Sequence, residues 1–146
     1  MERRTPRATR DNLGFLLAKA AQRWNELLAQ RFACEGFPEV RPSYGSLLVP
    51  LFEQDGLRMS ELAARARLSK QTMTTMVRLL ERDGLVRREP DPTDGRATRV
   101  YLTARSHSFE PVAERVVGEL DVLVGTRLSR NDLARLKAML KGVMSL

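Results

Sequence analysis

Residues 57–103 read LRMSELAARARLSKQTMTTMVRLLERDGLVRREPDPTDGRATRVYLT, and this stretch decides the fold. Its first part predicts a helix from about Ser60, whose hydroxyl can cap the opening turn, to a tight turn at residues 66–68. A second helix, capped by Ser69, is predicted to run to about Asp83. Two helices joined by so short a turn are typical of a helix-turn-helix motif.

The second of these helices has two chemically different faces. Apolar residues at spacings of three and four predict its buried face: Met73, Met76, Val77 and Leu80. The other face carries amide, hydroxyl and cationic groups: Lys70, Gln71, Thr74, Thr75 and Arg78. Such groups suit base edges and phosphates in the major groove of DNA, which is wide enough to admit a helix. Gly84 supplies the left-handed residue that ends the helix.

A basic hairpin follows. Residues 85–89 predict one strand, residues 90–95 are rich in turn formers, and residues 96–102 predict the returning strand. An arginine near a hairpin tip can follow the phosphate backbone or enter a narrow minor groove. We expect Asp94 to hold the Arg96 guanidinium by a charge-assisted hydrogen bond. Helix, turn, helix and hairpin in this order predict a winged helix-turn-helix that binds DNA.

At these residues the chain resembles the MarR (multiple-antibiotic-resistance regulator) family of bacterial winged-helix proteins. The matching elements are Glu61-Leu-Ala, Leu68-Ser69, the LERDGLV of residues 80–86, and Asp94-x-Arg96 six residues before Leu102-Thr103. The likeness covers about residues 44–103 position by position, and the flanking helices match in length, order and apolar pattern. The resemblance implies an obligate dimer, a pseudo-palindromic operator, and relief of repression when a small ligand or oxidant changes the spacing of the reading helices.

Carried over by position, the resemblance places residues 69–75 and Arg78 in the major groove, with Arg96 reading at the wing tip and Asp94 as its anchor. The DNA-binding residues expected from pattern and resemblance together are Ser69, Lys70, Gln71, Thr72, Thr74, Thr75, Arg78, Arg87, Arg88, Asp94, Arg96 and Arg99. Two positions depart from the family pattern. Gly95 stands where a basic residue is usual, which removes a phosphate contact and loosens the tip. Ser106 stands where a glycine is common, so the following junction matches less well.

Amphipathic helices flank this region. One is predicted over residues 11–32, and two follow the hairpin, capped by Thr103 and Ser129. Their apolar faces exceed what one chain can cover, so we expect a two-fold dimer with interleaved helices; the alternative is a monomer that buries these faces internally. The expected interface residues are Leu13, Leu16, Leu17, Leu120, Leu133, Leu136, Leu140 and Val143.

A further short helix is expected to begin near Pro42, with Ser43 as its cap, and to kink or end near Val49 because Pro50 lacks an amide hydrogen. The predicted fold class is therefore mainly α with a small β-hairpin wing and about six helices. We expect three parts in a single intertwined domain. Residues 1–41 form an arm and the first dimerisation helix, residues 42–103 the winged helix-turn-helix, and residues 104–146 the C-terminal dimerisation helices.

The composition agrees with a nucleic-acid partner. The net charge is +7, and 21 of the 25 basic residues are arginine, which favours bidentate contacts to guanine or phosphate. Solubility and codon bias are the alternative explanations of these two features. No stretch approaches the roughly 20 apolar residues of a membrane span, and no apolar segment follows the basic N-terminus, so we expect a cytoplasmic protein without a membrane partner. The lone cysteine excludes an intramolecular disulfide.

Other chemistry has little support in the sequence. There is no glycine-rich phosphate loop, cysteine-histidine cluster or nucleophile elbow, so we expect no enzyme activity, metal or cofactor. Cys34 permits a redox-sensor interpretation, but it follows the end of the first helix beside Glu35, and we expect an incidental thiol. The single histidine, His107, is predicted to be a solvated helix residue.

A crevice between the first two helices and the head is expected to hold a small aromatic effector. Its candidate lining residues, each of which also fits plain core packing, are Trp24, Phe32, Tyr44 and Leu48. The sequence thus predicts a sequence-specific transcriptional regulator of double-stranded DNA, a ligand-responsive repressor acting as a homodimer on a pseudo-palindromic operator. The alternative is a winged-helix module for protein contacts, or for DNA architecture without sequence choice.

Overall fold

The computed structural model describes residues 10–146, so the N-terminal segment predicted to precede the first helix lies mostly outside the described residues. Its elements are α1 (Leu13–Cys34), the 3-10 helix η1 (Pro42–Tyr44), α2 (Gly45–Glu53), β1 (Leu57–Arg58), α3 (Met59–Ala66), α4 (Lys70–Arg82), β2 (Val86–Pro90), β3 (Thr98–Leu102), α5 (Ala104–Leu128) and α6 (Arg130–Met144). This order confirms the predicted fold class of six helices and a small antiparallel wing.

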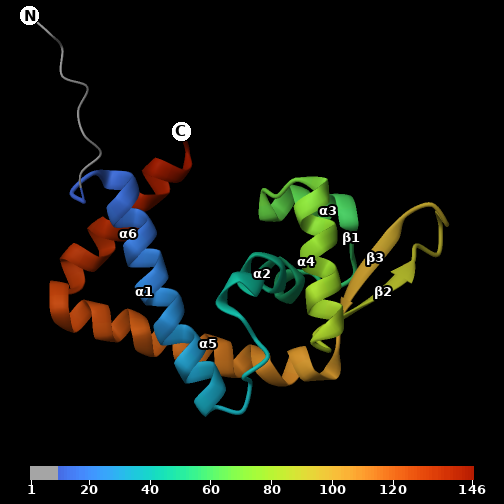
Figure 1. Cartoon of the computed structure of the whole chain (residues 1–146), viewed down its shortest axis with the longest axis horizontal. Coiled ribbons are helices and arrows are strands. Elements are labelled where there is room, and N and C mark those ends of the chain that lie inside the picture. The colour runs from blue at the N-terminus through green and yellow to red at the C-terminus, as the bar shows by residue number, and fades with distance from the viewer. Residues whose placement is uncertain (1–9) are drawn as a thin grey trace, which may run out of the picture.

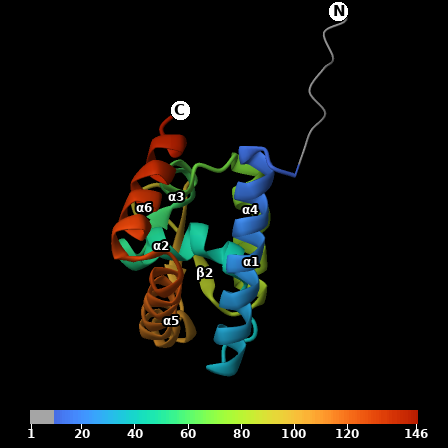
Figure 2. The same ribbon diagram turned by 90° about the vertical axis from the view of Figure 1, so that its left-hand side faces the viewer.

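The described chain has a head and an arm joined by one long helix (Figure 1). The head consists of α2, α3, α4 and the sheet, with the β2–β3 wing projecting from its outer side. Helix α5 begins under the head and runs across to the arm, which consists of α1, α6 and the distal half of α5. Seen along the long axis, α1 and α6 stand on different sides of the arm (Figure 2).

Short polar side chains begin four of the helices. The amides of Phe15, Thr72, Ser106 and Asp132 donate to the side chains of Asn12, Ser69, Thr103 and Ser129, which start α1, α4, α5 and α6. The last three caps confirm the sequence prediction. The Ser60 cap is wrong, because α3 begins one residue earlier and Glu61 accepts the Arg58 amide at 3.1 Å.

Pro50 does not end its helix, so the early end predicted near Val49 as the alternative to a kink is wrong. Helix α2 continues through it to Glu53, and the Gln54 amide donates to the Pro50 carbonyl at 2.9 Å. Pro50 is buried together with Leu47, Leu48 and Leu51. Burial of this apolar face offsets the one backbone hydrogen bond that proline removes. Ser43 lies inside η1 and does not cap α2.

The wing is the outer part of a three-stranded antiparallel sheet of order β1-β3-β2. The sequence prediction contained β2 and β3 but not the two-residue β1, whose Leu57 pairs with Val100. Gly56, just before β1, has a φ of +71°, and a Cβ there would come within 2.7 Å of the Tyr101 ring. Because glycine has no side chain, the chain at residue 56 can adopt this conformation and approach Tyr101 of β3 closely enough for β1 to pair with that strand.

The core lies within the head and along the first part of α5. Leu47, Leu62, Val77, Leu80 and Val100 have no exposed surface. The Ser106 position that departed from the family pattern is also buried, and its hydroxyl donates to the Leu85 carbonyl at 2.5 Å. The arm differs, since α6 contains no buried residue.

Among residues 10–146, none of the helices combines the length and the apolar composition that crossing a bilayer requires.

Candidate nucleic-acid interface

Helix α4 presents its polar face outward, as the periodicity predicted. Met73, Val77 and Leu80 are buried, whereas Lys70, Gln71 and Arg78 are exposed. Within residues 10–146 the side chains of Lys70, Gln71 and Arg78 have no hydrogen-bond or ion-pair partner. Three extended donors are therefore available to an external acceptor such as a phosphate or a base edge.

The hydroxyl groups of this helix are partly committed to the helix itself. Ser69 caps the first turn, and its Oγ also donates to the Thr72 hydroxyl at 2.9 Å. The hydroxyls of Thr74 and Thr75 donate to the carbonyls of Lys70 and Gln71, at 2.9 and 3.2 Å. Their free lone pairs can still accept from a donor such as a base amino group.

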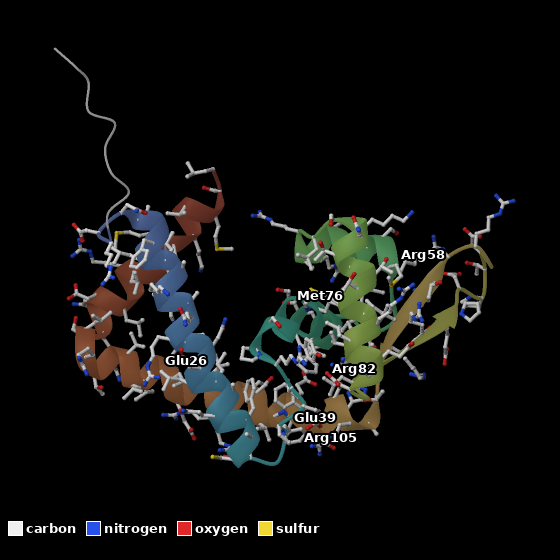
Figure 3. The ribbon with its side chains drawn as sticks, viewed as in Figure 1. Glu26, Glu39, Arg58, Met76, Arg82 and Arg105 are labelled. Carbon is white, nitrogen blue, oxygen red and sulfur yellow. The ribbon has the colours of Figure 1, made fainter. Side chains whose placement is uncertain are left out.

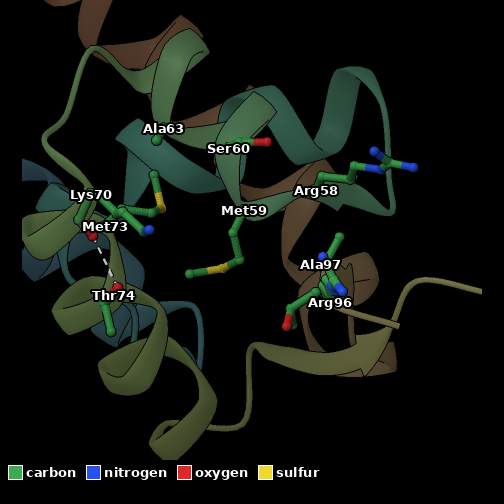
Figure 4. Close-up of a pocket in the computed structure, with 10 residues that line it drawn as sticks. Arg58, Met59, Ser60, Ala63, Lys70, Met73, Thr74, Arg96 and Ala97 are labelled. Carbon is green, nitrogen blue, oxygen red and sulfur yellow. Dashed lines mark hydrogen bonds between the residues drawn. The ribbon is translucent and has the colours of Figure 1, made fainter. Parts of the chain in front are cut away.

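A hollow of about 440 Å³ separates the start of α4 from the wing. In Figure 4, Lys70 and Thr74 lie on one side, Arg58 and Arg96 lie on the other, and the thioether of Met59 occupies the middle. Three cationic side chains thus border one concave surface, and since Arg58 pairs with the Asp91 carboxylate, Lys70 and Arg96 carry its unpaired positive charge. Such a surface attracts a polyanion, because the charges are close together and the walls exclude part of the solvent.

Arg96 extends from the exposed wing tip, but its anchor differs from the prediction. The Asp94 carboxylate accepts the backbone amide of Arg96 at 3.1 Å and makes no ion pair with its guanidinium. The carboxylate therefore shapes the turn and does not aim the side chain. Within the described part of the chain, the Arg96 guanidinium has no partner.

The residue that organises the wing is Asp91, which sequence reasoning missed. Its side chain has no exposed surface and pairs with Arg99 at 2.7 Å and with Arg58 at 2.9 Å. Its other oxygen accepts from the Thr93 hydroxyl and from the amides of Thr93 and Asp94. These bonds join the wing turn to β1 through Arg58 and to β3 through Arg99. The available signal was Asp91-Pro-Thr93, a sequence typical of an Asx turn.

The hydrogen bonds to Asp91 favour its charged form. Those from Thr93 have the largest effect, and Arg99 and Arg58 add to it, so the pKa of the Asp91 carboxyl lies far below its ordinary value. Asp91 is therefore ionised throughout the physiological pH range, and the wing base remains a permanent ion-pair cluster.

The remaining arginines expected to bind DNA are engaged within the protein. Arg99 donates to Asp91 and also to the Gly56 carbonyl at 2.8 Å. Arg88 makes a bidentate pair with Glu81 of α4, at 3.0 and 3.1 Å. Arg87 pairs with Glu89 at 3.1 Å and lies over the Tyr101 ring. Their assignment to DNA stays a prediction, but their first role in this structure is to brace the wing.

The far end of α4 is tied to the elements beneath it. Asp83, the residue that ends the helix, accepts a hydrogen bond from the Tyr44 hydroxyl and pairs with Arg82. Nearby, Arg105 at the start of α5 pairs with Glu39 (Figure 3). The Tyr44 hydrogen bond is the largest cause of a lowered Asp83 pKa, and burial followed by this same bond raises the pKa of Tyr44. These contacts join η1 to the end of α4 and the start of α5 to the loop before η1.

The residues expected to line an effector crevice lie mostly in the core. Phe32, Tyr44 and Leu48 are buried, and Phe32 packs edge-on against Phe109 with ring centroids 4.8 Å apart. Trp24 is half-buried against the same core. The effector role of these four residues stays a prediction.

The predicted interface residues fall into two groups. Leu120 is fully buried within the chain, so it has no surface left for a partner. All seven others are exposed or half-exposed along the arm: Leu13, Leu16, Leu17, Leu133, Leu136, Leu140 and Val143. Cys34 is exposed at the end of α1. His107 lies on the first turn of α5, and its Nε2 is 3.8 Å from Oδ2 of Asp55. No metal-binding cluster occurs among residues 10–146.

Comparison with known proteins gives consistent matches. A family model described as MarR family matches residues 42–98. A curated HTH-type transcriptional repressor of Mycobacterium tuberculosis is 36% identical over 91 residues, covering 62% of this chain and 66% of that protein. The chain thus spans slightly less than two thirds of the length of that relative.

Solved structures match over nearly the whole chain. The PcaV transcriptional regulator of Streptomyces coelicolor, in complex with its natural ligand, superposes with a TM-score of 0.79 at 19% identity, covering 97% of this chain and 98% of that one. The repressor CouR, bound to a 23-mer DNA duplex, gives a TM-score of 0.78 at 23% identity, covering 95% and 99%. At these identities the likeness establishes the fold.

Proposed function

Because a MarR family model matches residues 42–98, we propose that the chain belongs to this family and is a transcriptional regulator that binds double-stranded DNA sequence-specifically, as a homodimer on a pseudo-palindromic operator. We further propose that it is a repressor whose affinity for DNA changes with a small effector. In that role the protein acts in the cytoplasm.

One observation carries the proposal. Lys70 of α4 and Arg96 at the wing tip, whose side chains have no partner within residues 10–146, border one hollow, whereas the arginines of the wing base are neutralised by carboxylates. A protein that only needed positive charge for solubility would have no reason to leave Lys70 and Arg96 opposite each other. This placement suits α4 in a major groove and Arg96 in the neighbouring minor groove.

The arm supports the dimer. It exposes Leu16, Leu123, Met139 and Leu140 over several helical turns, which is more apolar surface than a monomer usually leaves in water. A second copy covering this surface would place two reading helices on one side of the assembly. They must be about 34–36 Å apart to enter successive major grooves.

A response to an effector follows from the same geometry. Helix α5 belongs to the arm at one end and to the head at the other, where Ser106 donates to Leu85 just beyond α4. A ligand that changes the angle between head and arm therefore changes the separation of the reading helices. The solved CouR and PcaV structures hold DNA and a natural ligand respectively on this fold.

The test is selection of bound duplexes from a random pool, followed by titration of the selected and a scrambled duplex at one fixed salt concentration. We expect a two-fold symmetric sequence bound at least about a thousandfold more tightly than the scrambled one. Equal affinity for both would assign the protein to architectural DNA binding, and no binding to either would assign it to protein contacts. Sedimentation of the complex checks for two chains per duplex.

A further inference from the structure

Arg67, in the turn between α3 and α4, has a left-handed backbone conformation that arginine rarely adopts. Its φ is 54° and its ψ is 42°, and its amide donates to the Ala64 carbonyl at 3.3 Å, which ends α3. Glycine is the usual residue at such a helix end, because a side chain makes this conformation less favourable. A long side chain held there against this strain calls for an explanation, which its contacts supply.

The guanidinium of Arg67 reaches the far end of the arm. Its Nη1 donates to the backbone carbonyl of Met144, the last residue of α6, at 3.0 Å. The two residues are 77 positions apart in the chain, and the end of α6 lies beside α3 (Figure 2). We call this contact the Arg67 latch.

The Met144 carbonyl is an acceptor that α6 itself leaves unused. The last carbonyls of a helix have no partner within the helix and carry partial negative charge. The amides of Ser145 and Leu146 donate to the carbonyls of Gly142 and Val143. Within residues 10–146 the guanidinium of Arg67 is therefore the only donor to the Met144 carbonyl, and its positive charge suits the negative end of the helix.

Among the described residues, the Arg67 latch is the only hydrogen bond or ion pair that joins α6 to the head. Lys137 of α6 pairs with Asp121 of α5 at 2.5 Å, which is a contact inside the arm, and α6 has no buried residue. The two chain connections between head and arm, residues 35–41 and α5, lie on the opposite side of the molecule (Figure 1). A body attached on one side can pivot, and a second attachment on the other side opposes the pivot.

We propose that Arg67 is a positioning residue that fixes the angle between head and arm and, through it, the spacing of the two reading helices on DNA. The second part rests on the proposed function as a homodimer. Arg67 lies two residues before Ser69, the cap of α4, so the latch holds the head at the start of the reading helix. A head that pivots presents α4 at several separations, whereas successive major grooves require about 34–36 Å.

The size of the effect follows from the kind of bond. The net contribution of one hydrogen bond changes a two-state equilibrium by roughly twofold to tenfold. The latch therefore biases the angle, and a dimer with two latches has the larger bias. Arg67 needs no contact with DNA for this effect.

Distances between spin labels test the latch without DNA. Labels are placed at Gln71→Cys of α4 and Lys141→Cys of α6 in the full-length protein carrying Cys34→Ser. A large excess of unlabelled protein makes each measured distance one within a single chain. We expect one narrow distribution when Arg67 is present and a broader or shifted one in Arg67→Gln, whose side chain is shorter and uncharged. A broad distribution with Arg67 present, or identical distributions with and without it, overturns the proposal.

Arg65→Gln is the matched control. Arg65 lies on the same helix, and its guanidinium donates within the head, to Gln54 at 2.7 Å. The control removes the same charge and should keep the narrow distribution, so changes of equal size in Arg65→Gln and Arg67→Gln overturn the proposal.

Arg67→Gly separates the latch from stability. Glycine relieves the left-handed backbone, so this variant should melt at a temperature no lower than that of Arg67→Gln. It still lacks the guanidinium and should show the same broader or shifted distribution. A narrow distribution in Arg67→Gly would assign the effect of Arg67→Gln to the backbone and overturn the proposal.

Duplexes with altered spacing test the consequence for DNA. The selected symmetric sequence is compared with one lengthened by a base pair at its centre, which moves the half-sites apart by about 3.4 Å. The ratio of the two affinities is measured, because a uniform loss of affinity cancels in it. We expect this ratio to fall at least fivefold in Arg67→Gln and to stay within twofold of wild type in Arg65→Gln.

The two measurements can fail separately. If the label distances change while the affinity ratio does not, the positioning role on DNA is overturned and the proposed regulator remains. If the protein selects no symmetric sequence, the proposed function fails while the label distances still decide whether Arg67 holds the angle.

Discussion

The apolar side chains of the head are mostly buried within the chain, whereas many of those of the arm are exposed. In the head, Leu47, Leu62, Val77, Leu80 and Val100 are completely removed from solvent. In the arm, α6 has no buried residue, and side chains such as Val122 and Met139 are more than half exposed. The head is therefore stabilised within the chain, whereas the arm has a complete apolar face still to cover.

This difference indicates that the stabilities of the head and of the arm depend on different factors. Stability of the head depends on packing alone and should not change with protein concentration. In the proposed dimer the stability of the arm depends on association, so it should rise with concentration by mass action. The following four variants test this contrast and the organisation of the head, from the largest expected effect to the smallest.

Leu80→Ala removes a fully buried side chain between α4 and the sheet. We expect a loss of about 2–5 kcal/mol in the free energy of unfolding, because the lost burial and the resulting cavity both contribute. Urea denaturation at two protein concentrations measures it. A loss that changed with concentration would show that the head also depends on the partner.

Leu140→Asp places a charge on the exposed apolar face of α6. If that face is covered in a dimer, the buried unpaired charge should weaken association by about 3 kcal/mol or more, with little effect on the head. Sedimentation equilibrium should then show a monomer that has lost most of its operator affinity. A dimer of wild-type affinity and DNA binding would place the interface elsewhere.

Arg96→Ala removes the unpaired guanidinium at the wing tip. We expect operator binding to weaken by about 1–3 kcal/mol without a change in melting temperature, since no intramolecular contact is lost. Arg99→Ala is the matched control, because it removes the same group from the Asp91 cluster and should lower the melting temperature. Equal melting temperatures for the two variants would contradict the division between free and bracing arginines.

Asp91→Asn keeps the shape of the wing-base residue and removes its charge. We expect a melting temperature lower by about 2–4 °C at pH 7 and a smaller loss of operator affinity than Arg96→Ala causes. The lowered pKa of Asp91 sets the pH dependence. Its stabilisation is complete above the unfolded-state pKa of about 3.9 and is lost as the pH falls toward the folded value.

Melting curves from pH 7 to pH 3 check this sign. The difference between wild type and Asp91→Asn should be constant down to about pH 4 and shrink below it. A difference that grew on acidification would mean that the carboxyl is protonated in the folded protein at neutral pH.

Local sequence signals predicted most of the fold. Ser69, Thr103 and Ser129 begin their helices as expected, and Gly84 has the predicted positive φ of +76°. The errors occur where a contact distant in sequence decides. Strand β1 is two residues long and exists because β3 lies beside it, and Pro50 stays helical because its neighbours are buried.

The candidate interface was predicted less completely than the fold. Periodicity alone identified the outward face of α4, since a helix with one buried side must expose the other. It could not distinguish Arg96 from Arg99, which lie three residues apart on the same ribbon. It also missed Asp91, whose partners include residues 33 positions before and 8 positions after it in the chain.

The sequence by itself determined the order of elements, the two faces of α4 and the excess of positive charge, because periodicity and capping act over only a few residues. The tertiary structure alone decided which charges remain available. Asp91, Glu81 and Glu89 neutralise four of the arginines around the wing, whereas Lys70, Arg78 and Arg96 have no side-chain partner within residues 10–146. Ion pairs form between atoms a few ångströms apart, and only the folded chain brings those atoms together.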